Sequence, residues 1–183
     1  MLYALLDQLP DSRRGQGKMY ENGTVLFCSI LAIMSGATSY RKIYTFMKTH
    51  FSNLSKFLKL PWIKPPSYST IRRIICATDS KELETAFRLH AKKLASLEKD
   101  SEKKYGHISI DGKVVRGSFD HFEDQSAIQV LSAFLSKKNL ILGHEEIENY
   151  KTNEIPMAQK LIKALKLKGI LFTSDALHCQ KKL

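Results

Sequence analysis

The feature of this sequence that most limits its fold is a change in the spacing of its apolar residues near residue 100. In the first part, apolar residues recur at the i, i+3, i+4 and i+7 positions of an amphipathic helix, as at Tyr40, Ile43, Tyr44 and Met47. In the second part, residues 107–112 alternate between apolar and polar, which is typical of a half-buried strand. A charged run at 98–104 separates the two parts. We therefore expect a helical domain over residues 1–100 and a second domain over residues 105–183.

Several segments of the first part have the features of helices. Residues 24–35 are apolar nearly all round, and a second helix is expected at about 39–50 after a short glycine-containing break. Two helices joined by a tight turn suit a helix-turn-helix, although plain helical hairpins have the same pattern. Ser67 or Ser69 can cap a third helix, and Asp79 can cap a long fourth one.

The second part has the element order of an α/β sheet domain. Strands are expected at 107–112, 127–135 and 139–147, followed by a helix that begins near Asn153 and a short strand at 170–173. In such an order the last strand returns to lie beside the first. We therefore expect an α+β protein, in which a helical N-terminal domain precedes a partial α/β core of three strands, a helix and a strand.

The charge of the chain indicates a polyanionic partner. The chain carries 29 Lys and Arg against 18 Asp and Glu, for a net charge of +11. Residues 1–100 hold 16 of the basic and 8 of the acidic residues, so most of the surplus lies in the helical part. Nucleic acid is the commonest such partner, and the alternative is a basic helical domain with no partner. For any single basic residue, a solvated helix face is the more common role. The predicted DNA-binding residues, in loops or at helix starts, are Arg13, Arg14, Arg41, Lys42, Arg72 and Arg73.

Other classes of protein are disfavoured by what the sequence lacks. The longest apolar run, residues 25–34, is shorter than the roughly 20 residues that a membrane span needs. No basic leader with an apolar core opens the chain and its three cysteines lie far apart, so we expect a cytoplasmic protein with reduced thiols. There is no glycine-rich phosphate loop and no zinc-type spacing of His and Cys, so neither ATP use nor a zinc site is predicted.

Two aspartates stand where they can carry chemistry. Asp111 follows an alternating apolar pattern, and Asp175 follows the apolar strand at 170–173. If the two strands are neighbours, both carboxylates lie near one edge of the sheet, where Mg²⁺ could bind them together with substrate phosphate. Two such ions would assist the cleavage and transfer of a phosphodiester. Turn or cap roles at strand ends are the alternative, and the Asp111-Gly-Lys113 string also has a weak likeness to restriction nucleases.

Six segments, spread over nearly the whole chain, form one collinear pattern. They are DSRR (11–14), SGATSYR (35–41), PSYSTIRR (66–73), HISIDGKVVRGS (107–118), KTNEI (151–155) and GILFTSDALHCQK (169–181). In this order they resemble the insertion-sequence transposases of the H-repeat-associated type, a match more specific than any single motif. The resemblance implies a helical domain joined to a ribonuclease-H-like core. That core uses an Asp-Asp-Glu triad and Mg²⁺ for DNA strand cleavage and transfer at the ends of an insertion element.

By position, the resemblance makes Asp111 the first carboxylate of the triad and Asp175 the second, both as ligands of Mg²⁺. The third lies well downstream of the second in that family, whereas the sequence ends at Leu183. Glu154 precedes Asp175 and opens a helix, so we interpret it as a cap or accessory residue. We therefore expect a transposase or a truncated fragment of one, with uncovered sheet surface that favours self-association. The alternative is a catalytically inactive DNA-binding remnant or a regulator of transposition.

Overall fold

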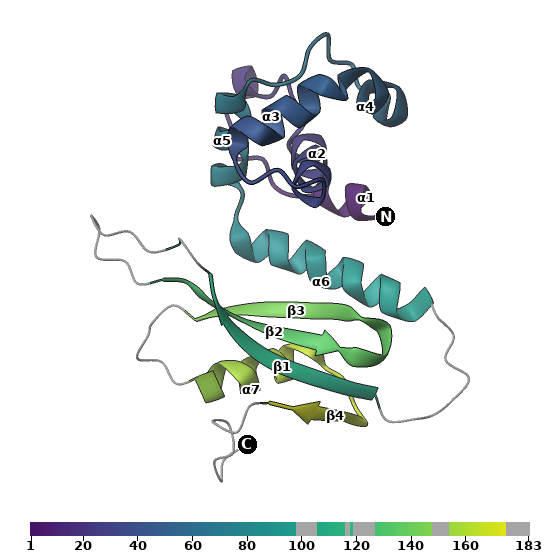
Figure 1. Cartoon of the computed structure of the whole chain (residues 1–183), viewed down its shortest axis with the longest axis vertical. Helices are drawn as coiled ribbons and strands as arrows, with labels where there is room; N and C mark the ends of the chain where they lie inside the picture. The colour runs from purple at the N-terminus through teal and green to yellow at the C-terminus, as the bar shows by residue number, and fades with distance from the viewer. Residues whose placement is uncertain (98–105, 116–117, 119–126, 148–153, 175–183) are drawn as a thin grey trace. The chain divides into compact units, whose positions relative to one another are not determined.

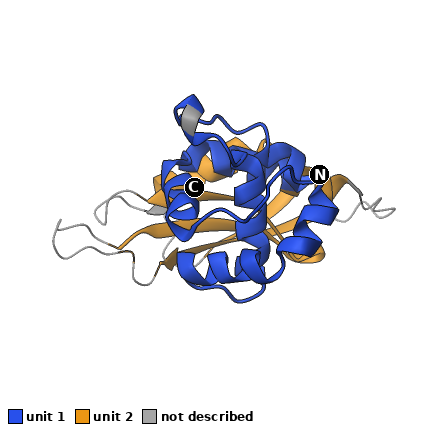
Figure 2. Ribbon diagram, turned by 90° about the horizontal axis from the view of Figure 1, so that it is seen from above, with its two compact units in different colours: residues 1–90 blue, residues 91–183 orange. Residues whose placement is uncertain are grey.

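The chain divides into two compact units (Figure 2), Met1–His90 and Ala91–Leu183. The computed structural model describes residues 1–97, 106–115, 118, 127–147 and 154–174. The division between the units falls inside helix α6 (Ser80–Leu97), earlier than the charged run that the sequence suggested as a boundary. The last residues of α6 belong to the second unit because they pack with other residues of that unit. Ala95 contacts that unit's apolar core, and its carbonyl accepts a 2.5 Å hydrogen bond from Lys138 Nζ.

The first unit is built from helices (Figure 1). Besides the start of α6 and a 3₁₀ turn η1 (Gly15–Gly17), they are α1 (Leu2–Leu6), α2 (Asn22–Met34), α3 (Tyr40–Thr49), α4 (Phe51–Leu58) and α5 (Tyr68–Ala77). The helices predicted at 24–35, at 39–50 and after Ser67 and Asp79 are confirmed, but α4 is not among the predicted helices. None of the helices within the described ranges is both long and apolar enough to cross a membrane.

Side-chain caps set where three of these helices begin. Ser39 and Ser67 each accept a hydrogen bond from the backbone N–H three residues further on, at 3.2 and 3.3 Å. Asp79 accepts two such bonds, from the N–H groups of Lys81 and Glu82 at 2.8 and 3.1 Å. Each cap satisfies N–H groups that have no partner within the helix. The caps at Ser39 and Ser67 therefore define the first turns of α3 and α5, which carry basic and aromatic side chains.

The core of the first unit surrounds α2. A Cβ atom on Gly23 would lie only 2.5 Å from the Cα atom of Asp7, so the end of α1 crosses α2 at a point where only glycine fits. Burial raises the pKa of the Cys28 thiol to about 11, and this cysteine belongs to the core. The largest fully buried apolar side chains of this core are Leu6, Val25, Met47, Ile71 and Ile74.

The second unit contains a four-stranded sheet within the described residues (Figure 1). Its elements are β1 (Gly106–Val114), β2 (Gln129–Leu135), the 3₁₀ turn η2 (Ser136–Lys138), β3 (Leu140–Ile147), α7 (Glu154–Leu165) and β4 (Ile170–Thr173). The strand order is β3-β2-β1-β4, with β4 parallel to β1 and the other pairs antiparallel. The prediction of three strands, a helix and a strand that returns beside the first is confirmed.

Helix α7 covers one face of this sheet. Ala158 and Leu161 of α7 pack in one buried cluster with Ile108, Ile110 and Leu131 of the strands. Because side chains alternate along a strand, the residues between the buried positions of β1 lie on the opposite face. The chain therefore has the predicted α+β fold, in which a helical unit precedes a partial ribonuclease-H-like core.

Candidate catalytic carboxylate and nucleic-acid interface

Asp111 lies in β1, on the face of the sheet opposite α7. Its backbone neighbour Ile110 is buried in the core, whereas the Asp111 side chain is 65% exposed. The Nζ atom of Lys113, two residues further along the same face, lies 3.5 Å from Asp111 Oδ2. Both side chains are largely exposed, so water screens their attraction and the ion pair is weak. The carboxylate of Asp111 is therefore open to a cation or to a substrate.

The pairing of β1 with β4 sets the position of the second predicted carboxylate in the register. Ser109 of β1 is the partner of Thr173 of β4, and the two strands run in parallel. Asp111 follows Ser109 by two residues, and Asp175 follows Thr173 by two residues. Asp175 itself lies outside the described residues. Glu154 is the first residue of α7, and its side chain is also not described.

Among the described residues, no three His, Cys, Asp or Glu side chains form a group that could hold a metal ion. An exposed carboxylate such as Asp111 does suit Mg²⁺, which keeps several waters and takes one or two protein carboxylates together with phosphate oxygens. The exposed carboxylate of Asp111 therefore has the donor chemistry that a magnesium site uses.

The first unit contains a segment that has basic residues and no acidic ones. Residues 22–78 contain eight Lys and Arg and no Asp or Glu, and they span α2 to α5. Five of these cations are exposed on α3 and α5. Lys48 lies in the last turn of α3, and we name the other four the α3–α5 basic face: Arg41, Lys42, Arg72 and Arg73. No acidic side chain of this segment offsets them, so a positive potential is expected here.

Contacts between α3 and α5 hold the basic face together. The guanidinium of Arg41 lies 5.6 Å from the ring centre of Tyr68, the first residue of α5, in a cation–π contact. The Tyr40 hydroxyl lies 3.6 Å from Cys76 Sγ. This hydrogen bond, together with burial, raises the pKa of Tyr40, and the nearby charge of Arg72 opposes the increase. The first turn of α3 and the length of α5 thus form one surface.

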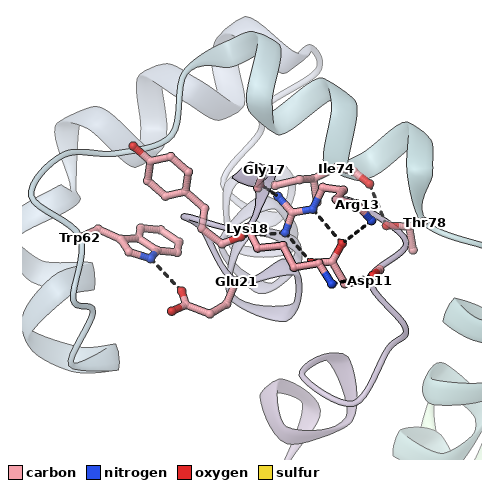
Figure 3. A network of polar contacts seen from close by, with 9 residues as sticks. Asp11, Arg13, Gly17, Lys18, Glu21, Trp62, Ile74 and Thr78 are labelled. Carbon is pink, nitrogen blue, oxygen red and sulfur yellow. Dashed lines mark hydrogen bonds and ion pairs between the residues drawn. The ribbon is translucent and has the colours of Figure 1, made fainter. Parts of the chain in front are cut away.

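Arg13 and Arg14 have different surroundings, although the sequence predicted the same role for both. Arg13 donates to both carboxylate oxygens of Asp11, at 2.8 and 2.7 Å, and to the carbonyls of Gly17 and Tyr20 at 3.0 and 2.8 Å (Figure 3). The hydrogen bonds from Arg13 to the carboxylate hold the pKa of Asp11 below its usual range. Arg14 is exposed. The guanidinium of Arg13 therefore closes the loop that precedes α2, and of this pair Arg14 is the one available to a ligand.

Two parts of these sites are absent from the sequence predictions. Tyr68 joins the basic face through its contact with Arg41, and the acid-free segment 22–78 is the sequence signal that marks its neighbourhood. His107 and Thr173 form a side-chain hydrogen bond of 2.7 Å that joins β1 to β4. No local pattern indicates that bond, because the two residues meet only when the parallel pairing forms.

Comparisons with known proteins identify relatives over almost the whole chain. A family profile described as DDE_Tnp_1-associated matches residues 3–91. In Escherichia coli K12, the protein named "Putative transposase YncI" is 32% identical over 195 residues, covering 100% of this chain and 72% of the relative. Two further K12 proteins, "Putative protein YbfL" and "H repeat-associated putative transposase YhhI", are each 31% identical over 176 residues, covering 96% of this chain.

The fold and these relatives define the class of protein. A helical unit precedes a partial ribonuclease-H-like sheet, and the relatives that match nearly the whole chain include proteins named as putative transposases. The chain belongs to the H-repeat-associated transposase family. It spans 44% of the length of YbfL and of YhhI.

Proposed function

We propose that this chain acts in a DNA transposase of an insertion element. In this proposal the first unit binds double-stranded DNA at the ends of the element. Asp111 and Asp175 in the second unit hold Mg²⁺ for strand cleavage and transfer. The observation that carries the proposal is the parallel pairing of β1 with β4, in which Ser109 and Thr173 are partners and an aspartate follows each by two residues.

Asp111 and Lys113 have distinct tasks in this mechanism. Asp111 presents an exposed carboxylate, the donor type that Mg²⁺ prefers. When bound, Mg²⁺ supplies a positive charge that stabilises the phosphate oxygens during in-line displacement. Lys113 Nζ, 3.5 Å from the same carboxylate, places a mobile cation where a DNA phosphate would approach. Lys113 therefore orients the phosphodiester beside the carboxylate that holds the ion.

The α3–α5 basic face is the proposed DNA contact. Arg41 and Lys42 lie in the first turn of α3, so their charges add to the partial positive charge of that helix N-terminus. Arg72 and Arg73 extend the face along α5. Neutralisation of phosphates by Lys and Arg releases counterions, so this contact gives affinity that depends on salt and little on sequence.

DNA binding without catalysis is the second candidate function. It is favoured by the contrast between the two sites. All four side chains of the basic face lie within the first unit, whereas the described residues hold no group of three metal-ligating side chains. A protein of this kind would occupy element ends and regulate transposition without cutting DNA.

Fluorescence anisotropy of the full chain with a labelled duplex tests the DNA-binding proposal. We expect the logarithm of the binding constant to fall linearly with the logarithm of salt concentration. The double variant Arg41→Gln/Arg72→Gln should reduce that slope by about 2, on the order of one unit for each lost phosphate contact. A charge-matched control, Lys163→Gln/Lys168→Gln in the second unit, should leave the slope near that of the wild type. Equal slopes for the two double variants would remove the basic face from the proposal.

A further inference from the structure

Four side chains form a hydrogen-bonded chain on the face of the sheet that carries Asp111. Ser136 Oγ, in the turn η2, lies 3.2 Å from Nδ1 of His107, and His107 Nε2 lies 2.7 Å from Thr173 Oγ1. The Thr173 hydroxyl donates in turn to Ser109 Oγ at 3.4 Å. The chain therefore joins η2, β1 and β4 through side chains alone.

One tautomer of His107 satisfies every bond in this chain. Because the Thr173 hydrogen is donated to Ser109, the Thr173 oxygen must accept from His107, whose Nε2 then carries the proton. Nδ1 is then free of hydrogen and accepts from the Ser136 hydroxyl. An imidazole held between two hydroxyls has a defined ring orientation, so it links β1 to β4 at a fixed distance.

Strand β4 needs such a link because it is short. It has four residues, and within the sheet as described β1 is its strand neighbour. At the start of the pairing, the Ile170 side chain packs over Gly106, where a Cβ would lie 2.8 Å from Ile170 Cδ1. At the end of β4, the hydrogen bond from His107 to Thr173 gives a side-chain link to β1.

We infer that His107 and Thr173 are positioning residues that keep the end of β4 in register with β1. Asp111 and Asp175 follow the paired residues Ser109 and Thr173 by two positions each in the sequence. This inference rests on the proposed function, because the register of the two strands affects Mg²⁺ binding only if both strands carry ligands of the ion. Neither residue contacts the ion in this account. Each acts through the strand that carries a ligand, so its loss should weaken metal binding without unfolding the chain.

Binding of Mn²⁺ to the full chain, followed by electron paramagnetic resonance of the free ion, tests the inference. Thr173→Val keeps the shape of the side chain and removes the hydroxyl, and we expect about fivefold weaker Mn²⁺ binding, the scale of one side-chain hydrogen bond. Thr173→Ser restores the hydroxyl and should bind almost as the wild type does. His107→Ala should weaken binding to a similar extent, with partial rescue by His107→Gln. Thermal unfolding of each variant should stay close to that of the wild type.

The controls separate the inference from the proposed function. Thr85→Val removes a hydroxyl that bonds within its own helix α6 in the first unit, and it should leave Mn²⁺ binding unchanged. Asp111→Ala should abolish binding. If the wild type binds no Mn²⁺, or if Asp111→Ala binds as the wild type does, the proposed metal site is wrong and the inference is wrong with it. If Asp111→Ala abolishes binding while Thr173→Val and His107→Ala do not alter it, the positioning role alone is overturned.

Discussion

At the residue scale, Arg13 and Arg14 differ in what they stabilise. The Arg13 side chain is 14% exposed and binds Asp11 and two loop carbonyls, whereas Arg14 is exposed. We expect Arg13→Ala to lower the free energy of unfolding by about 2 kcal/mol, the scale of hydrogen bonds to charged groups. Arg14→Ala should change it by less than about 0.5 kcal/mol, as most exposed substitutions do. Urea unfolding measures both, and equal effects would contradict the structural role of Arg13.

The bond between Arg13 and Asp11 also gives stability a pH dependence. Hydrogen bonds from Arg13 hold the pKa of Asp11 below its usual range, so the folded state binds fewer protons at this site than the unfolded state does. The resulting stability is present above the pKa of the unfolded chain, about 4, and is lost as the pH falls through the lower folded value. The free energies of unfolding of the wild type and Asp11→Asn should therefore differ most at neutral pH. The difference between them should shrink below about pH 4. A constant difference would show that charge is not its source.

At the scale of elements, the crossing of α1 and α2 depends on one glycine. A Cβ at Gly23 would lie 2.5 to 2.7 Å from backbone atoms of Leu6 and Asp7, which cannot move aside as a flexible side chain can. Gly23→Ala should therefore lower the free energy of unfolding by about 1–3 kcal/mol, as overpacking does. Gly15→Ala is the matched control, because nothing lies within 4 Å of a Cβ there. Chemical denaturation should show a clearly lower free energy of unfolding for Gly23→Ala and almost no change for Gly15→Ala.

Elements with a strong local pattern were predictable, and contacts between distant elements were not. The spacing of apolar residues in α3 and the alternation in β1 each indicate an element that the structure contains. Helix α4 has only eight residues and follows α3 across a single residue, so its pattern merges with that of α3. The role of Arg13 and the link from His107 to Thr173 depend on tertiary contacts, which residue spacing does not report.

Asp111 shows the same limit at the candidate site. The sequence predicted a carboxylate at the end of an alternating strand, whereas the structure places Asp111 inside β1, with its side chain exposed beside the buried Ile110. Its pairing with Asp175 remains a prediction, because Asp175 lies outside the described residues. The strand order and the parallel register of β1 with β4 support that pairing. Residue spacing alone does not indicate which strands are neighbours.

At the scale of the whole molecule, the two units separate two kinds of chemistry. The acid-free segment of the first unit, residues 22–78, suits a phosphate backbone. The exposed face of the sheet in the second unit has a carboxylate with a lysine beside it, which suits a metal ion and one phosphate. The two activities should therefore be separable by mutation. Changes in the basic face should reduce DNA affinity and leave Mn²⁺ binding intact, and Asp111→Ala should do the reverse.

Catalysis by a polypeptide of residues 1–183 depends on how many metal-binding carboxylates it holds. The resemblance to this family implies a triad of carboxylates, of which Asp111 and Asp175 are the two assigned positions. In-line displacement needs charge stabilisation at both the entering and the leaving oxygen, and a missing ligand weakens one of the two ion positions. We therefore expect the purified polypeptide to bind a labelled duplex but neither to nick nor to join it with Mg²⁺ or Mn²⁺.

Cleavage and joining are tested by incubating the polypeptide with element-end DNA and either metal, followed by denaturing electrophoresis. Binding under the same conditions, measured by anisotropy, shows that an uncut duplex was nevertheless occupied. Cleavage that Asp111→Ala abolishes would contradict the prediction, and it would mean that another acid completes the site. Glu154, the first residue of α7, would then be the first to replace with Gln. Cleavage that survives Asp111→Ala would instead indicate a contaminating nuclease, since it would not depend on the carboxylate that the mechanism requires.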